Sequence, residues 1–355
     1  MTETDVFLVG AGPIGLELAA SLRRGGVEYL HIEAGQVGQT VMSYPHQAQF
    51  FSSPSRIAIA GVPLHTPDQT KATREQYLAY LRAVVEQYNL PIRTYERLIG
   101  VKRDPATGRF FLRTRHGGDE YAYSARCVVL AIGDMHAPRM LHIPGEDLPH
   151  VTHYFVEPHP FFRQRLLIVG GRNSAVEAAI RCHRAGAQVT LAYRRADFDR
   201  KAIKYWLLPE LDALIKHGQI TFLPQTIPTS ITKTHATLSA VDEHCHVLPQ
   251  TTRRLEAHAV LLLTGYVQDT TLFELAGVTL VGPNRAPQID PDTMQSDVPN
   301  LFVAGTAAAG TQLSFRLFIE NCHVHVTRIF RAITGRDPDR ALINDAGQTY
   351  GLPES

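Results

Sequence analysis

Two glycine-rich turns, each between an apolar run and a helical pattern, carry the clearest chemical signal in the sequence. The first turn holds Gly10, Gly12 and Gly15 directly after the apolar run 6–9. In a strand–turn–helix unit the first glycine permits a tight turn, the second lets backbone approach a pyrophosphate, and the third allows close helix–strand packing. The next apolar run ends at Glu33, whose carboxylate can accept hydrogen bonds from a ribose. The pattern predicts a dinucleotide site that favours an unphosphorylated ribose, as in FAD.

The same design recurs at Gly170 and Gly171, but the second strand of this unit ends in basic residues instead of an acidic one. Arg194 and Arg195 stand where the first unit has Glu33. Two guanidinium groups suit the 2′-phosphate of NADPH, which a carboxylate would repel. The alternative for these arginines is an ordinary solvated surface. Arg172 replaces the usual second glycine, so its side chain must point away from the pyrophosphate or bind it.

The composition indicates a globular chain whose net charge is too small to attract polyanions. The 355 residues carry 35 Lys+Arg and 34 Asp+Glu, a formal net charge of +1. We therefore expect no nucleic-acid partner, and no apolar run approaches the ~20 residues of a membrane helix. The four cysteines lack the spacing of a disulfide framework or zinc site, and His244-Cys245-His246 is better explained as a loop than as a metal site. We expect a cytoplasmic protein without a metal.

Five segments resemble the two-domain pyridine-nucleotide flavoproteins of the low-molecular-weight thioredoxin reductase type, and within them the bacillithiol-disulfide reductase group. The matching segments are 44–64, 152–162, 168–179, 203–209 and 318–321. The resemblance implies an α/β fold of two Rossmann-like three-layer dinucleotide-binding domains. It also implies one FAD, NADPH as electron donor, and a homo-oligomer, with a dimer expected.

The order of the segments predicts a discontinuous domain with an insertion. Residues 1–137 and 268–355 are expected to form the FAD domain, and residues 138–267 the NADPH domain. The apolar runs 127–133 and 260–264 each end in a small-residue turn, typical of the return to a nucleotide domain. An apolar helix around residues 317–319 is expected to direct its N-terminus at the flavin ring.

The expected FAD-binding residues come from the first glycine turn, the following strand end, a loop, and two later turns. They are Gly10, Gly12, Pro13, Ile14, Gly15, Glu33, Ala34, Tyr44, Phe51, Ser52, Ala131, Gly133, Gly305 and Thr306. In related flavoproteins the position of Thr306 is usually Asp, so a hydroxyl must serve or the contact is lost. For Tyr44, Phe51 and Ser52 the alternative is ordinary packing of a loop.

The expected NADPH-binding residues surround the second glycine turn. They are Gly170, Gly171, Arg172, Asn173, Ser174, Tyr193, Arg194, Arg195, Lys204 and Gly265. Lys204 could instead be a solvated helix lysine.

The chain departs from its relatives in the residues that would handle the electron acceptor. Thioredoxin reductases have a Cys-x-x-Cys pair where this chain has residues 153–156, and bacillithiol-disulfide reductases often have cysteine where it has Ile14. Cys322 is the remaining candidate for disulfide chemistry, and His153 is a candidate proton donor. Their alternatives are a packed core thiol and a histidine hydrogen-bonded in the domain hinge.

These observations favour an NADPH-dependent FAD oxidoreductase that transfers hydride from NADPH to flavin N5 and reduces a low-molecular-weight disulfide. One alternative acceptor is an electron-carrier protein, as in the thioredoxin-reductase-like ferredoxin/flavodoxin–NADP reductases. A flavin monooxygenase is a third possibility. A redox sensor that binds FAD without turnover is the alternative from outside the enzymes.

Overall fold

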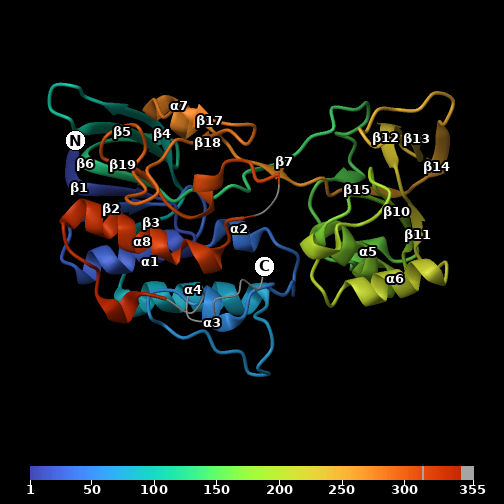
Figure 1. The fold of residues 1–355 in the computed structure, drawn as a ribbon, viewed down its shortest axis with the longest axis horizontal. Helices are drawn as coiled ribbons and strands as arrows, with labels where there is room; N and C mark the ends of the chain where they lie inside the picture. The colour runs from blue at the N-terminus through green and yellow to red at the C-terminus, as the bar shows by residue number, and fades with distance from the viewer. Residues whose placement is uncertain (314–315, 345–355) are drawn as a thin grey trace. The chain divides into compact units, whose positions relative to one another are not determined.

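The computed structural model describes residues 1–313 and 316–344, and its contacts divide the chain into two compact units (Figure 1). Unit 1 contains residues 1–43 and 47–137 and the described residues from 267 onward. Unit 2 contains Tyr44–His46 and Pro138–Tyr266. The chain passes between the units at two short strands that pair with each other, β7 (Ala137–Pro138) and β16 (Tyr266–Val267).

Unit 1 is built on a seven-stranded sheet in which one long strand pairs with both parallel and antiparallel neighbours. The strands are β1 (Thr2–Val9), β2 (Tyr29–Ile32), β3 (Ile92–Arg93), β4 (Glu96–Arg103), β5 (Phe110–His116), β6 (Asp119–Leu130) and β19 (Leu301–Val303). β1 pairs in parallel with β2 and with β6. The first part of β6 pairs antiparallel with β5, and its last residues pair in parallel with β19. The carboxyl ends of β1, β6 and β19 therefore meet at one edge, where ligands of parallel sheets bind.

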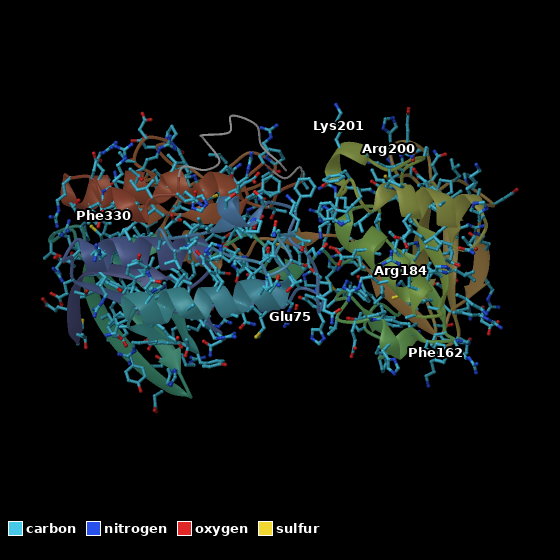
Figure 2. All side chains as sticks on the ribbon, turned by 90° about the horizontal axis from the view of Figure 1, so that it is seen from below. Glu75, Phe162, Arg184, Arg200, Lys201 and Phe330 are labelled. Atoms are coloured by element: carbon cyan, nitrogen blue, oxygen red, sulfur yellow. The ribbon has the colours of Figure 1, made fainter. Side chains whose placement is uncertain are left out.

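Helices cover this sheet because their apolar faces need burial. They are α1 (Pro13–Arg24), α2 (Gln39–Met42), α3 (Pro54–Ile57), α4 (Arg74–Tyr88), α7 (Thr271–Ala276) and α8 (Ile319–Thr334), with the 3₁₀ turns η3 (Gly305–Ala309) and η4 (Arg340–Leu342) and the small ribbon β17 (Leu280–Val281) and β18 (Ala286–Pro287). α1 and α8 lie side by side (Figure 1). Phe330 of α8, labelled in Figure 2, packs so closely where α1 ends that a Cβ on Gly25 would lie 2.6 Å from its ring.

Unit 2 combines a parallel sheet with an antiparallel one. The parallel strands, in spatial order, are β11 (Thr221–Leu223), β10 (Gln188–Ala192), β9 (Arg165–Val169), β15 (Ala259–Leu262) and β8 (Val151–Thr152). The antiparallel strands are β12 (Thr226–Ile231), β13 (His235–Ala240) and β14 (Arg253–Glu256). Its helices are α5 (Asn173–Arg184) and α6 (Leu208–Lys216), with the 3₁₀ turns η1 (His159–Phe161) and η2 (Arg200–Ala202). Apolar residues from both faces of the parallel sheet form separate cores, one with α5 and α6 and one with β12 to β14.

The prediction of a mixed α/β fold is confirmed, and both strand–turn–helix–strand repeats form. α1 and α5 each have 12 residues and each joins two parallel strands. The helix expected around residues 317–319 begins later than predicted, because Phe318 is the extended N-cap residue and Ile319 the first helical one. No helix in the described ranges has the length and apolarity needed to cross a bilayer.

The start of α4 gives a direct test of how local sequence stabilises unit 1. The Thr73 hydroxyl accepts from Gln76 N–H, and the Gln76 side chain accepts from Thr73 N–H at 2.8 Å. Thr73→Ala should lower the free energy of unfolding by about 1 kcal/mol, since it removes one arm of this capping box. Urea denaturation is the measurement, with Thr73→Ser as a control that keeps the cap. Equal stability of the alanine and serine variants would contradict the assignment.

Candidate functional site

The first glycine turn leaves one position open while packing fills the other two. Gly10 has φ +105°, and a Cβ there would lie 2.4 Å from the Ala131 carbonyl oxygen. A Cβ on Gly15 would lie 2.1 Å from the Gly10 carbonyl oxygen. At Gly12, by contrast, no described atom lies within 4 Å of the place a Cβ would take. Gly10 and Gly15 are thus required by the protein's own backbone, and Gly12 faces free space.

The N-terminus of α1 opens into that space. Gly12 is the N-cap residue, so no side chain accepts from the first-turn N–H groups, and Pro13 follows at the first helical position. Backbone N–H groups and the helix dipole favour an anion there. This geometry fits the pyrophosphate of a dinucleotide.

Glu33 is aimed at the same turn. Glu33 directly follows β2. Its side-chain oxygen Oε2 accepts a hydrogen bond from Ala11 N–H, and Oε1 accepts one from Gly35 N–H, both at 2.7 Å. The residue is 9% exposed. An ionised carboxylate has about four acceptor positions, so two bonds fix its orientation and leave capacity for ribose hydroxyls. Together with the open Gly12, these contacts fit FAD.

Two further turns predicted to bind FAD meet the first one in unit 1. A Cβ on Gly305 would lie 3.5 Å from the Ile14 Cβ, and one on Gly133 would lie 3.9 Å from the Thr306 hydroxyl oxygen. Together with the Gly10–Ala131 approach, these contacts bring the ends of β1, β6 and β19 together. Of the loop residues, Ser52 is buried and Phe51 half-buried in unit 1, whereas Tyr44 groups with unit 2.

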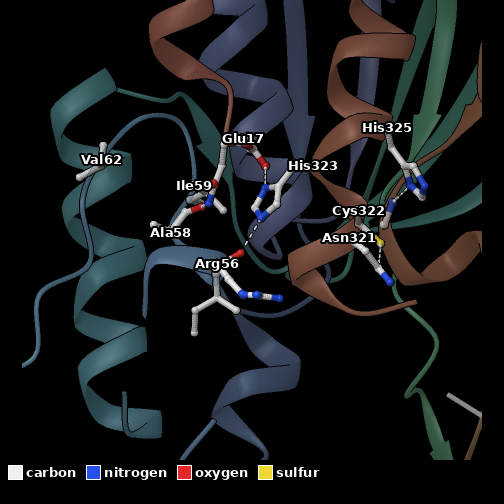
Figure 3. Close-up of polar contacts among 12 residues, drawn as sticks. Glu17, Arg56, Ala58, Ile59, Val62, Asn321, Cys322, His323 and His325 are labelled. Carbon is white, nitrogen blue, oxygen red and sulfur yellow. Dashed lines mark hydrogen bonds and ion pairs between the residues drawn. The ribbon is translucent and has the colours of Figure 1, made fainter. Parts of the chain in front are cut away.

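His325 holds the Gly305 turn, and sequence reasoning missed it. Gly305 N–H donates to its Nδ1 at 3.2 Å, so the neutral ring carries its proton on Nε2 (Figure 3). Burial lowers the pKa of His325 to about 4, which keeps it neutral near pH 7. Its place on α8 gives no sequence signal, because the partner is a backbone amide far away in the chain.

The structure argues against Cys322 as a nucleophile. It lies on α8, is 0% exposed, and its thiol is 3.8 Å from the Asn321 side-chain oxygen (Figure 3). Burial raises the pKa of its thiol, and the charges of Asp134 and Glu17 raise it further. Reactive cysteines need the opposite environment. All four cysteines are unpaired thiols, and only Cys245 is not buried.

A buried ionic cluster beside α8 ties three helices of unit 1 together. His323 Nδ1 is 2.7 Å from Glu17 Oε2, and its Nε2 is 2.9 Å from the Arg56 carbonyl oxygen (Figure 3). Both partners only accept, so both ring nitrogens must donate and His323 is an imidazolium. Burial works against the charged ring, but the charge and hydrogen bond of Glu17, the Arg56 carbonyl and the charge of Glu320 together outweigh it, and the pKa of His323 is raised.

The second glycine turn is shaped by packing within unit 2. A Cβ on Gly170 would lie 2.4 Å from the Leu263 carbonyl oxygen, and one on Gly171 would lie 2.4 Å from the Tyr193 ring. Tyr193 is 8% exposed and stacks on Phe198. Arg172 is the N-cap residue of α5 and is half-buried.

Two predicted NADPH residues are engaged with the protein itself. The Asn173 side chain accepts from Lys204 N–H at 2.7 Å and donates to the Ala202 carbonyl at 3.2 Å, which fixes the loop after β10. Lys204 Nζ is 3.0 Å from Glu177 Oε2 and lies over the Trp206 ring. Lys204 is therefore not a solvated lysine. Glu177 also pairs with Arg181, with 3.3 Å between Oε1 and Nη1, and NADPH binding by Lys204 stays a prediction.

Sequence reasoning missed Arg139, a cation on which the charges of Arg194 and Arg172 act. The pKa of Arg139 is lowered, first by burial and then by the charges of Arg194 and Arg172. Its backbone is held beside Gly265, whose carbonyl accepts from Arg139 N–H at 2.9 Å. Three arginines therefore gather at the carboxyl edge of the unit 2 sheet. Arg195 and Ser174 are exposed.

His153, the candidate proton donor, lies in unit 2 against Glu146. Its Nε2 is 3.5 Å from Glu146 Oε1, and the side chain is 11% exposed. The Glu146 carboxylate also accepts from the N–H groups of Leu141 and His142. Among the described residues neither ring nitrogen of His153 has a hydrogen-bond partner, so the alternative of a hydrogen-bonded histidine is not observed, and the proton-donor role stays a prediction. Within the described ranges, no group of three His, Cys, Asp or Glu side chains could hold a metal ion.

The His323 cluster predicts how stability depends on pH. Since the folded pKa of His323 is raised above the unfolded value of about 6.5, its contribution is complete below pH 6.5 and is lost as pH rises through the folded value. Glu17→Gln should lower the free energy of unfolding at pH 6 by about 3 kcal/mol and flatten this dependence. Urea denaturation from pH 6 to 9 is the measurement, with the exposed Glu28→Gln as control. If the free energy of unfolding varied with pH in the same way in wild type and Glu17→Gln, His323 would not be an imidazolium.

Comparison with known proteins identifies the family. The family model described as pyridine nucleotide-disulphide oxidoreductase matches residues 7–305. The Bacilliredoxin reductase Bdr of Bacillus subtilis (strain 168) is 31% identical over 337 residues, 95% of this chain and 99% of that protein. A ferredoxin–NADP reductase of Ignicoccus hospitalis is 33% identical over 198 residues, 55% of this chain and 57% of its own length.

A solved structure extends the likeness to three dimensions. The bacillithiol disulfide reductase of Bacillus cereus matches with a TM-score of 0.87 at 32% identity, over 95% of this chain and 100% of that one. The resemblance inferred from the sequence segments is confirmed. The chain belongs to the pyridine nucleotide-disulphide oxidoreductase family, an enzyme family that uses FAD and a nicotinamide nucleotide.

Proposed function

We propose that this member of the family is an NADPH-dependent FAD oxidoreductase that reduces a low-molecular-weight disulfide. In this proposal residues 1–137 and 268–355 form a Rossmann-like three-layer FAD domain, and residues 138–267 a similar NADPH domain. The observation that carries it is the contrast between the two turns. Glu33 faces the open turn of unit 1, and three arginines gather at the turn of unit 2.

In unit 1 the chain's own groups would bind and orient FAD. The first-turn N–H groups of α1 would bind the pyrophosphate, and Glu33 would bind the adenosine ribose. The turns at Gly133 and Thr306 would bind the remaining part of FAD. FAD, when bound, accepts a hydride from NADPH and passes its two electrons to the acceptor. The protein supplies position and exclusion of water, for which no acid or base is required.

In unit 2 the arginines would select the donor. A 2′-phosphate carries charge that Arg194 and Arg172 can neutralise, and it would relieve the repulsion these cations impose on Arg139. NADH lacks that phosphate and would leave the guanidinium groups unmatched. NADPH is therefore the proposed donor.

The proposed acceptor is a disulfide like that of bacillithiol. The reaction balances when NADPH gives a hydride, solvent gives a proton, the S–S bond breaks, and two thiols and NADP⁺ leave. The support is the name of the Bacillus cereus enzyme, to which this chain is 32% identical. We further propose a cytoplasmic homodimer, as the family resemblance implies.

One observation favours a second candidate, an electron-carrier protein as acceptor. The position of the first glycine turn that often holds cysteine is Ile14, and Cys322 is fully buried with a raised pKa. A site without a reactive thiol at either of these two positions suits transfer of single electrons to a ferredoxin or flavodoxin. The relative from Ignicoccus hospitalis has that kind of name.

Donor selection gives a quantitative prediction. Arg194→Ala combined with Arg195→Ala should raise the KM for NADPH about tenfold or more while changing the KM for NADH less than about twofold, because only NADPH carries the phosphate. Steady-state kinetics with both donors is the measurement.

The matched control removes two other arginines of unit 2. Arg165→Ala combined with Arg184→Ala deletes side chains that pair with Glu256 and Glu210 at the opposite edge of the sheet (Figure 2 labels Arg184). These changes should leave the ratio of the two KM values as in wild type. Equal rises for NADPH and NADH in the Arg194/Arg195 variant would disprove the 2′-phosphate assignment.

The acceptor is tested with reduced enzyme. After anaerobic reduction by NADPH, the enzyme is mixed in a stopped-flow cell with bacillithiol disulfide or, separately, with an oxidised ferredoxin or flavodoxin. Reoxidation by the disulfide supports the proposal. Reoxidation by the electron-carrier protein alone replaces it with the second candidate.

A further inference from the structure

His31 is a fully buried histidine that contacts the first glycine turn. It belongs to β2, is 0% exposed, and its Nε2 is 2.9 Å from the Gly10 carbonyl oxygen. A carbonyl only accepts, so Nε2 carries a ring hydrogen and donates it. Burial lowers the pKa of His31 to about 4, and the bond to Gly10 works in the opposite direction. The ring is therefore neutral near pH 7, with its one hydrogen on Nε2.

The peptide unit that His31 contacts is held at its other end by Glu33. The Gly10 carbonyl and the Ala11 N–H belong to one planar peptide, and Ala11 N–H donates to Glu33 Oε2 at 2.7 Å. The N–H of Gly10 donates to the Ile32 carbonyl at 2.8 Å. Three successive residues, 31 to 33, thus hold the backbone of Gly10 and Ala11.

The Gly10–Ala11 peptide leads into the open position of the turn. Gly12 follows it, with no described atom within 4 Å of the place a Cβ would take, and the uncapped N-terminus of α1 begins there. Because Ala11 N–H also orients the Glu33 carboxylate, a rotation of this peptide would displace the proposed ribose acceptor and the start of α1 together. The hydrogen bond from His31 opposes that rotation at the carbonyl end.

The second ring nitrogen indicates that packing alone does not account for His31. Its Nδ1 is buried and has no hydrogen-bond partner among the described residues. A buried acceptor without a partner costs folding free energy, and an apolar side chain of similar size would avoid that cost. The bond to the Gly10 carbonyl is the contact that a histidine makes here and an apolar residue could not make.

We infer that His31 is a positioning residue for the adenosine half of FAD, which acts through the Gly10–Ala11 peptide on the glycine turn and on Glu33. The inference rests on the proposed function, because it requires FAD in unit 1. In that function Glu33 binds the adenosine ribose and the start of α1 binds the pyrophosphate. ADP carries both of these groups, so it is the fragment of FAD that His31 should affect.

The test is the affinity of folded apoprotein for FAD and for ADP. FAD binding is followed by flavin fluorescence, and ADP is titrated as a competitor of FAD. His31→Leu removes the donor and should weaken both ligands by the same factor, about fivefold to tenfold, as expected for one lost hydrogen bond. Lower stability alone would leave both dissociation constants unchanged while the apoprotein is folded, which far-UV circular dichroism checks.

Two amide variants separate the hydrogen bond from the ring. A glutamine places an N–H at about the reach of histidine Nε2, whereas an asparagine is shorter by one methylene group. His31→Gln should keep both affinities within about twofold of wild type, and His31→Asn should lose as much as His31→Leu. This pair also tests the inference if His31→Leu fails to fold. Equal affinities of the glutamine and asparagine variants would overturn it.

The matched control is Tyr29→Phe. Tyr29 lies on the same strand with its ring centroid 6.5 Å from that of His31, and no other described residue hydrogen-bonds its buried hydroxyl. Removal of this hydroxyl should leave both affinities as in wild type. An equal loss in Tyr29→Phe and His31→Leu would contradict the inference, because the effect would then not depend on the bond to Gly10.

Two outcomes separate the inference from the proposed function. If His31→Leu bound FAD and ADP as tightly as wild type, or lost affinity for FAD alone, the inference would be wrong and the proposed function would stand. If the wild-type protein bound no FAD, the proposed function would be wrong, and the inference with it.

Discussion

The close approach of backbone to backbone at the first glycine turn is the constraint on which unit 1 depends. The Gly10 position lies against the Ala131 carbonyl, and the Gly15 position against the Gly10 carbonyl, with no room for a Cβ at either. These approaches let α1 start at the sheet edge and bring the end of β6 beside the end of β1. Only then does Gly12 face open space at an uncapped helix N-terminus. A single side chain at Gly10 or Gly15 would separate the elements that form the candidate site.

Charge distinguishes the two units, which share the same strand–turn–helix–strand design. Unit 1 presents Glu33, already oriented by two backbone N–H groups. Unit 2 presents arginines that repel one another. Both turns hold their first glycine against a strand carbonyl, at Gly10 and at Gly170. In the proposed function, the side chains after the second strand therefore decide which nucleotide each unit favours.

The sequence predicted what depends on neighbours in the chain. Both repeats, with α1 and α5 between parallel strands, follow from local apolar periodicity and glycine spacing. It did not predict partnerships between distant segments. The fold brings together the hydrogen-bonded pairs His325–Gly305 and Asp134–Gln312. It likewise brings together the ion pair Lys204–Glu177. Arg139 was missed for the same reason, since it lies outside both repeats and reaches the glycine turn only through the fold.

The most direct test of the account is the visible spectrum of the purified protein before and after anaerobic NADPH. Two nucleotide sites of opposite charge preference predict a flavin spectrum that NADPH bleaches rapidly and NADH bleaches far more slowly at equal concentration. A protein that takes up no FAD, or whose bound flavin neither nucleotide reduces, would contradict the account.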